Sequence, residues 1–249
     1  MNFHDWEPVY ERILADFGFD RAGDERARDL LADLLADSPG SAAGASGDGA
    51  DASDAGEPLA PTDLDFAGET VAVAGAGPSL ADDHDLVRAA DSVVAASDAA
   101  TRLREAGVGV DAMVTDLDEE GDIAARLTRE GTPVAVHAHG DNESALRQRV
   151  PGLSAAAVLP TTQAAPVAGV SNTGGFTDGD RAAFLADHCG AAELVFAGWD
   201  FDDPDVGPMK AKKLVWAERL LRWLERRRGE RFGVLDGRRD GIDESALPA

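Results

Sequence analysis

Lysine and cysteine are almost missing from this chain of 249 residues, which holds three lysines and one cysteine. A single cysteine, Cys189, cannot form an intramolecular disulfide, and we interpret it as a buried, unreactive thiol. No apolar run approaches the ~20 residues that a membrane helix needs. The first eleven residues include several acidic side chains, unlike a secretory signal. These absences predict a soluble, cytoplasmic protein.

Positive charge of any kind is in short supply. The chain has 47 Asp and Glu residues against 23 Lys and Arg, which gives a net charge of −24. Such an excess repels polyanions and therefore argues against nucleic acid or an anionic membrane as a partner. Together with heavy use of Ala, Asp and Arg, it is typical of proteins adapted to molar salt, which screens the self-repulsion. We interpret the charge as a halophilic surface rather than as a clue to chemistry.

The chain divides into three zones. In residues 1–37 apolar side chains recur every three or four positions, which predicts two short amphipathic helices. Residues 38–61 are mostly Ser, Gly, Ala, Asp and Pro, a composition that favours a flexible linker. Apolar residues make up 44% of the chain as a whole, which is enough for a sizeable core, and we expect residues 62–249 to form an α/β catalytic domain with a C-terminal helix.

Regular apolar runs in the third zone predict its secondary structure. Strands are expected at residues 70–74, 92–96, 112–115, 133–137, 156–160 and 194–197. Helices are expected between most of them, at 99–106, 123–130, 142–150 and 180–189, and a long final helix at 208–228. Strands that alternate with helices indicate an α/β fold with a doubly wound, mainly parallel sheet and helices on both faces.

Small and polar residues follow the predicted strands. Because ligands of open parallel sheets bind beyond the carboxyl ends of the strands, we expect the active site at this edge. The first loop contains Gly75, Gly77, Pro78 and Ser79, whose backbone amides could face a phosphate. The alternative is a tight strand-to-helix turn. The loop has Leu80 where a dinucleotide fingerprint needs a third glycine.

Acidic residues after the third and fourth strands suggest a metal site. Asp116 and Asp118 alternate along a strand end and should point to the same side, and two such oxygen ligands suit Mg²⁺. Like charges so close together are unfavourable unless a cation or a proton relieves them. Asp141 adds a carboxylate from the neighbouring loop. The alternative is a set of solvated loop acids in a very acidic protein.

Two histidines and the three lysines are the remaining unusual residues. We interpret His137 and His139 as hydrogen-bond partners of the acids or of phosphate, or as strand-end packing; zinc or iron is less favoured because no cysteine or third histidine is nearby. The lysines are Lys210, Lys212 and Lys213, at the start of the final helix. Cations there oppose the helix dipole, which predicts a bound anion such as phosphate. A solvated patch balanced by neighbouring acids is the alternative.

Several of these motifs, in this order, resemble the MptE-like archaeal 6-hydroxymethyl-7,8-dihydropterin diphosphokinases. The matching segments are residues 6–10, 75–80, 115–118, 137–142, 174–181 and 198–201. The resemblance spans nearly the whole chain apart from the linker. More distantly, the acids at 98, 116, 118 and 141 are similar to the signature of thiamine pyrophosphokinases.

The resemblance implies Mg²⁺-dependent transfer of diphosphate from ATP to the hydroxymethyl group of a reduced pterin, with release of AMP, in folate or tetrahydromethanopterin biosynthesis. Mg²⁺ would be held by Asp116, Asp118 and Asp141. ATP would be contacted by Gly75, Gly77, Pro78, Ser79, His139, Lys210 and Lys212. The catalytic group would be Asp98, Asp178, Asp180 and Arg181, with Phe176 and Trp199 as candidates for stacking on the pterin.

Three other readings stay open at this point. A metal-dependent nucleotide-sugar glycosyltransferase would use a similar glycine loop. A dinucleotide-binding or S-adenosylmethionine-binding enzyme would use Asp98, which lies 23 residues after Gly75, to hold a ribose. A non-catalytic binding module would use the acids for solubility alone. ATP and a reduced pterin are the expected partners, and a homo-oligomer is left open.

Overall fold

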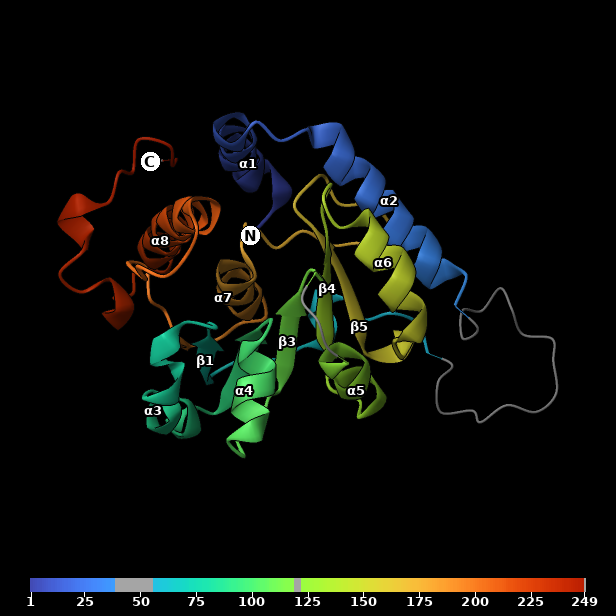
Figure 1. Ribbon diagram of the computed structural model, residues 1–249, viewed down its shortest axis with the longest axis horizontal. Helices are drawn as coiled ribbons and strands as arrows, with labels where there is room; N and C mark the ends of the chain where they lie inside the picture. The colour runs from blue at the N-terminus through green and yellow to red at the C-terminus, as the bar shows by residue number, and fades with distance from the viewer. Residues whose placement is uncertain (39–55, 119–121, 249) are drawn as a thin grey trace.

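The computed structural model describes residues 1–38, 56–118 and 122–248 of the chain. The fold is built on a six-stranded sheet in the order β5-β4-β3-β2-β1-β6, with every neighbouring pair parallel. The strands are β1 Thr70–Ala74, β2 Ser92–Ala96, β3 Ala112–Thr115, β4 Val134–Ala138, β5 Val158–Thr162 and β6 Glu193–Ala197. Runs of Val and Ala are typical of parallel strands that are covered on both faces. The predicted parallel α/β sheet is confirmed (Figure 1).

Helices cover both faces of the sheet. One layer is formed by α2 Arg21–Ala36, α3 His84–Ala89, α4 Ala99–Glu105, α5 Ile123–Arg129 and α6 Glu143–Arg149. The opposite layer is formed by α1 Phe3–Phe17, α7 Asp178–His188 and α8 Pro208–Arg228. Because side chains alternate along a strand, Val71 and Val73 enter the core with α7 and α8, whereas Ala72 and Ala74 enter the other core.

The N-terminal helices are part of these two cores. Trp6 of α1 is fully buried, with its ring centroid 6.4 Å from that of Phe184 on α7 and 6.5 Å from that of Trp223 on α8. Helix α2 packs against α6 and β5 on the opposite face of the sheet. The two helices therefore cover opposite faces of the sheet (Figure 1), and the junction between them lies beside the loops at the carboxyl ends of the strands.

Most element boundaries agree with the sequence. Strands β1 to β3 span the expected residues, and β4 to β6 differ by one or two. Helix α7 begins two residues earlier than expected because Thr177 and Asp180 cap it reciprocally. The short helix α3 was missing from the sequence prediction. None of the helices in the described ranges is long and apolar enough to cross a membrane.

The end of the predicted linker belongs to the folded body. Residues 39–55 lie outside the described residues, but the N–H of Leu59 donates a 2.7 Å hydrogen bond to the carbonyl of Val158 at the start of β5. The chain then enters a short 3₁₀ turn, Pro61–Asp63, before β1. The folded α/β unit thus begins a few residues before residue 62.

The strand order creates a switch point between β1 and β6. Strands β1 to β5 follow one another across the sheet, and the chain then returns through α7, which lies over β1, β2 and β3, to place β6 on the other side of β1. The loops that leave β1 and β6 touch. A Cβ atom at Gly75 would lie 2.7 Å from the carbonyl oxygen of Gly198, and one at Gly198 would lie 2.4 Å from that of Gly75. Crevices at such points bind ligands in open α/β sheets.

We expect Gly198→Ala to destabilise the protein strongly. Gly198 has φ = 68°, so a side chain adds backbone strain to the clash with Gly75, and the loss of unfolding free energy should be about 2–5 kcal/mol. Gly107→Ala is the matched control, because Gly107 has φ = 71° but nothing within 4 Å of an added Cβ, and only about 1–2 kcal/mol of strain applies. Urea unfolding followed by tryptophan fluorescence measures both. Equal losses would show that the loop contact is not tight.

Candidate active site

A cavity of about 490 Å³ opens at the carboxyl edge of the sheet. The loops after β1, β2, β3, β4 and β6 form its floor, the junction of α1 and α2 forms one wall, and the start of α8 forms another. This size is within the range of ~300–1,000 Å³ that is usual for small-molecule sites. The structure thus places a cavity where the sequence predicted the active site.

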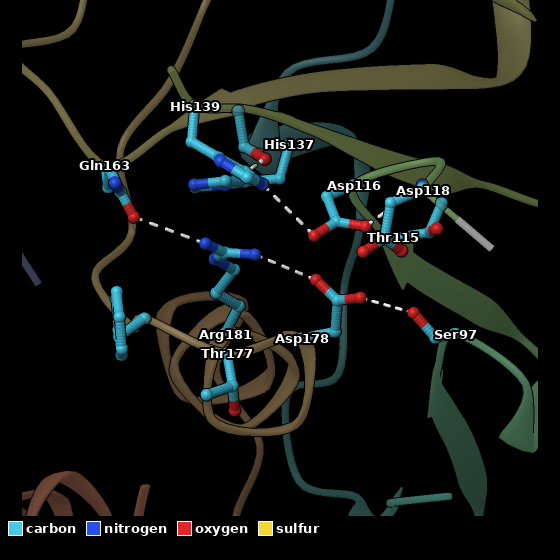
Figure 2. A network of polar contacts seen from close by, with 12 residues as sticks. Ser97, Thr115, Asp116, Asp118, His137, His139, Gln163, Thr177, Asp178 and Arg181 are labelled. Atoms are coloured by element: carbon cyan, nitrogen blue, oxygen red, sulfur yellow. Dashed lines mark hydrogen bonds and ion pairs between the residues drawn. The ribbon is translucent and has the colours of Figure 1, made fainter. Parts of the chain in front are cut away.

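Arg181 lies at the centre of the polar side chains in this cavity (Figure 2). Its Nη1 donates to Asp178 Oδ1 at 2.8 Å, and its Nη2 donates to Gln163 Oε1 at 3.2 Å. Asp178 also accepts a hydrogen bond from the hydroxyl of Ser97 at the end of β2. Asp178 and Arg181 occupy the first turn of α7 three residues apart, so they project from the same side of the helix.

Asp116, directly after β3, is held by donors on both of its oxygens. His139 Nε2 lies 3.1 Å from Asp116 Oδ2, and the backbone N–H of Asp118 donates to Asp116 Oδ1 at 3.2 Å. The N–H of Asp141 contacts His139 Nδ1 at 3.4 Å, which leaves Nε2 to carry the ring proton toward Asp116. Leu117 between the two acids has φ = 61°, a sharp turn that returns Asp118 to the cavity. The predicted hydrogen bond from a histidine to an acid is present.

Two carboxylates in the cavity are shifted in opposite directions. Burial opposes ionisation of Asp116, but side-chain hydrogen bonds with His139 and Asp118, together with the charge of Arg181, outweigh it and lower its pKa. Burial, followed by the negative charge of Asp116, raises the pKa of Asp178, against the opposing effect of Arg181 and Ser97. A permanent anion therefore lies beside a carboxylate that accepts a proton more readily, the pattern that separates electrostatic and acid–base roles.

The second histidine lies behind the cavity. His137 is 2% exposed, and its Nδ1 contacts Thr161 Oγ1 at 3.1 Å. Burial, with a smaller effect of Arg181, lowers the pKa of His137, so the ring is neutral. Its ring centroid is 6.3 Å from that of His139. Among the described residues no group of three His, Cys, Asp or Glu side chains could hold a metal ion.

The glycine loop after β1 uses its amides within the protein. Gly75 N–H donates to the carbonyl of Ala197 at 2.8 Å, and Gly77 N–H donates to that of Gly198 at 2.9 Å. The N–H and hydroxyl of Ser79 both donate to Asp200 Oδ2. Gly75 and Gly77 line the cavity, whereas Pro78 and Ser79 lie outside its lining. The glycines are thus explained by the close contact of two loops rather than by a free set of amides.

Two of the three lysines face the cavity and the third points away from it. Lys210 and Lys213 line the cavity, and neither has a hydrogen bond or an ion pair with any residue in the part of the chain that the structure describes. Lys212 Nζ instead lies 2.9 Å from Asp16 Oδ1 and 4.5 Å from the ring centroid of Phe17. Lys213, which the sequence did not select as a contact, therefore takes the place expected for Lys212.

Some predicted residues lie elsewhere. Asp98 is exposed at the start of α4 and outside the cavity lining. Asp180 is fully buried, and its carboxylate accepts hydrogen bonds from the N–H groups of Phe176 and Thr177 and from the Thr177 hydroxyl. Through these hydrogen bonds Asp180 stabilises the conformation of the loop before α7. Asp141 is exposed at the rim of the cavity and lines it together with Asp116 and Asp118.

Asp24 and Gln163 are among the lining residues that were not selected from the sequence. Asp24 comes from α2 and is 3% exposed, and Gln163 follows β5 and is 4% exposed. Gln163 stands in the polar run after a predicted strand, which was a usable signal. Asp24 had none, because it is one acid among many on an amphipathic helix.

Fold and site together define a parallel α/β protein with a polar cavity, lined by carboxylates, an arginine and two lysines, at the switch point of its sheet. A family model described as 6-hydroxymethylpterin diphosphokinase MptE-like matches residues 56–206. The chain is 39% identical over 243 residues to a 6-hydroxymethyl-7,8-dihydropterin pyrophosphokinase of Methanothermobacter thermautotrophicus, over 91% of this chain and 96% of the relative. It is 36% identical to the protein of the same name from Pyrococcus furiosus, over 90% and 95% of the two chains. A third of that name, from Methanocaldococcus jannaschii, is 28% identical over 90% and 96%.

The chain belongs to the MptE-like family, and the resemblance seen in its motifs is confirmed. As the relatives are pyrophosphokinases by name, it is an enzyme of the diphosphotransferase class. The matched region contains every strand of the sheet, together with Asp116, His139, Asp178 and Arg181. Helices α1, α2 and α8 all lie outside the matched region, although the curated relatives align over nearly the whole chain.

We expect Asp178→Asn to become more stable relative to the native protein as the pH rises. The folded-state pKa of Asp178 lies above its unfolded-state value of about 3.9, so the native protein loses stability as the pH rises from about 4 through the raised pKa. The amide introduced by the substitution does not ionise, so the variant does not lose stability in this way. Urea unfolding in EDTA at about pH 4.5 and about pH 8 measures the difference.

Asp16→Asn should show the opposite sign and is the matched control. Hydrogen bonds from Trp216 and Lys212 lower the pKa of Asp16, so its ionised form stabilises the fold once the pH exceeds about 4, and the variant loses that contribution. If the unfolding free energy of Asp178→Asn fell relative to that of the native protein at the higher pH, the raised pKa of Asp178 would be contradicted.

Proposed function

We propose that this protein is a 6-hydroxymethyl-7,8-dihydropterin diphosphokinase, which transfers the β,γ-diphosphate of ATP to the pterin hydroxymethyl group in a Mg²⁺-dependent reaction and releases AMP. The observation that carries the proposal is the pairing, in one cavity, of two lysines that have no partner among the described residues with two carboxylates of opposite pKa shift. The names of the relatives support the substrate. Folate or tetrahydromethanopterin biosynthesis is the corresponding pathway.

The cationic wall of the cavity suits the triphosphate of ATP. Lys210 and Lys213 lie three residues apart on the first turns of α8 and face the cavity. In a chain with a net charge of −24, two lysines without a carboxylate partner among the described residues would be poorly placed unless an anion binds there. The N-terminus of the 21-residue helix α8 adds its backbone N–H groups to this positive region.

Asp116 and Asp118 fit a Mg²⁺ ion that is shared with ATP. Mg²⁺ is usually held by one or two carboxylates together with substrate phosphates and water, so a complete protein cage is not required. Asp116 stays ionised, and its orientation is fixed by His139. A bound Mg²⁺ would neutralise phosphate charge. Asp141 at the rim can contact the same ion through water.

Asp178 is placed to take the proton of the pterin hydroxyl. Its raised pKa makes it a better base than an ordinary carboxylate, and Ser97 and Arg181 fix its two oxygens. As the hydroxyl oxygen bonds to the β-phosphorus, the bond from that phosphorus to the oxygen of the α-phosphate breaks. The hydroxyl proton passes to Asp178, and AMP leaves with the electron pair of the broken bond. Arg181 balances the negative charge of the acids around the reacting groups.

Aromatic side chains form an apolar part of the cavity that suits the pterin ring. The Trp199 indole donates to the Val73 carbonyl at 3.0 Å and rests against Gly179, where an added Cβ would lie 3.0 Å from its ring. Phe19 and Phe176 also line the cavity, and the ring centroid of Phe176 lies 5.0 Å from that of Phe17 at the end of α1. A flat heterocycle gains both burial and stacking in such a place.

Asp116→Asn should abolish turnover with an intact fold. Purified protein is incubated in high salt with ATP, Mg²⁺ and 6-hydroxymethyl-7,8-dihydropterin, and AMP release is followed together with the phosphorus NMR spectrum of the product. We expect pterin-dependent AMP that is lost on chelation, and a fall in kcat of about 100-fold or more for Asp116→Asn. Asp85→Asn is the control, because this exposed acid pairs only loosely with Arg88, at 3.7 Å. If the folded native protein releases no AMP, the proposed reaction is wrong.

The neighbouring lysines provide an internal comparison for ATP binding. Lys210→Ala and Lys213→Ala should each raise the KM for ATP about tenfold, since each removes a charge-assisted contact with phosphate. Lys212→Ala should raise it far less, because Lys212 is bound to Asp16. Initial rates at varied ATP concentration measure all three. A larger effect of Lys212→Ala would refute the assignment of the cationic wall.

A further inference from the structure

A chain of buried hydrogen bonds links the N-terminal helices to the catalytic cluster. Tyr10 OH on α1 donates to Asp24 Oδ2 at 2.7 Å, and Gln163 Nε2 donates to the same oxygen at 2.8 Å. Gln163 Oε1 then accepts from Arg181 Nη2 at 3.2 Å, and Arg181 holds Asp178 (Figure 2). Each member of the chain from Tyr10 to Arg181 is at most 6% exposed.

We propose that Asp24 is a positioning residue for diphosphate transfer, which sets the direction of the Gln163 amide and thereby the place of Arg181. The proposal rests on the proposed function and adds to it residues of α1 and α2. Asp24 touches neither Arg181 nor Asp178 through any hydrogen bond in the described residues, so it acts through Gln163.

The physical basis is the difference between a carboxylate and an amide. An ionised carboxylate only accepts hydrogen bonds, so Gln163 must turn its NH₂ group toward Asp24 and its oxygen toward Arg181. With the amide reversed, an N–H group would face the guanidinium, which is also a donor, and Arg181 would lose this contact. Burial and the hydrogen bond to Asp24 raise the pKa of Tyr10, which keeps its hydroxyl a donor as well. The backbone of Gln163 is fixed separately by Trp6 Nε1, which donates to its carbonyl at 3.0 Å.

Asp24 also holds the loop that carries His139. Its Oδ1 accepts a 2.7 Å hydrogen bond from the N–H of Gly140. The backbones of Gly23 and Gly140 touch at this point, where a Cβ on either residue would meet the other backbone at 3.2–3.3 Å. The carboxylate of Asp24 is thus connected to the partners of both active-site acids. Through Gln163 it fixes Arg181, which binds Asp178, and through Gly140 it fixes the loop of His139, which binds Asp116. The N-terminal helices are a working part of the site.

The test exchanges the carboxylate at position 24 with the amide at position 163. In the diphosphokinase assay Asp24→Asn should lower kcat about tenfold or more with a smaller change in KM for ATP, because Gln163 is free to reverse. Gln163→Glu should also lose activity, because two buried carboxylates then adjoin. The double variant Asp24→Asn with Gln163→Glu should regain most of kcat, since an amide at 24 donates to a carboxylate at 163 that still accepts from Arg181. Failure of the double variant to regain activity would overturn the proposal.

Two comparisons separate positioning from stability. Leu31→Ala on the same helix removes a fully buried apolar side chain outside this chain of hydrogen bonds, and it should lower the melting temperature while kcat stays near native. Asp24→Asn should add little further loss in an Arg181→Lys background, because its effect passes through Arg181. An unchanged loss in that background overturns the proposal. If Asp24→Asn does not fold, Gln163→Met replaces it, with the same expected loss of kcat.

A structural measurement separates this inference from the proposed function. Crystal structures of the native protein and of Asp24→Asn show whether Arg181 stays 2.8 Å from Asp178, as in the native chain. Displacement of Arg181 supports the inference, and an unmoved Arg181 overturns it, whether or not the native protein turns over. A native protein that folds but forms no pterin diphosphate counts against the proposed function alone.

Discussion

The site depends on a buried guanidinium, Arg181, which forms an ion pair with Asp178 and whose positive charge also helps to lower the pKa of Asp116, at the carboxyl end of a parallel sheet. Burying a charge is costly unless it is paired and hydrogen-bonded, and breaking one partner of such a cluster leaves an uncompensated charge. Asp178 accepts from Arg181 and Ser97, while Asp116 is held by His139 and by the backbone of Asp118. The reciprocal cap of Thr177 and Asp180 fixes the first turn of α7, from which Arg181 projects. Much of the surrounding hydrogen bonding therefore serves to keep one cation in place.

The fold supplies this arrangement through its strand order. Since β6 lies beside β1 at the far side from β2, the chain has to return over the sheet, and α7 is the helix that makes the return. The N-terminus of α7 thereby arrives above the ends of β2 and β3, next to Ser97 and Asp116. The same return brings the loops after β1 and β6 together, where Gly75 and Gly198 admit the close contact. The glycine loop that resembles a phosphate cradle thus closes the floor of the cavity.

Local patterns were sufficient for most of the sheet and for part of the site. Buried parallel strands are short, apolar and bounded by polar loops, so β1, β2 and β3 could be placed to the residue, whereas α3 has one buried side chain, Val87, and no periodic pattern to reveal it. Asp116 and Asp178 were found because they follow strand ends or stand in family motifs. Asp24 could not be found, since the role proposed for it depends on a contact with Gln163, which lies 139 positions further along the chain. Lys212 and Lys213 differ by about 100° of helix rotation, which the sequence of an isolated helix start does not fix.

Arginine and lysine side chains have different roles in this protein. Arginine has a planar fork that binds carboxylates in fixed geometry, and here it forms most of the ion pairs, such as Arg239 with Glu225 and Arg228 with Asp187. Lysine is a compact, strongly hydrated charge on a flexible stem, and it is nearly absent. In this acidic protein the three lysines lie within four positions, and two of them face a cavity without a carboxylate partner among the described residues. This placement supports the proposal that they bind an exchangeable anionic ligand. Scarcity makes the position of these lysines informative, in a way that it would not be in a protein of balanced charge.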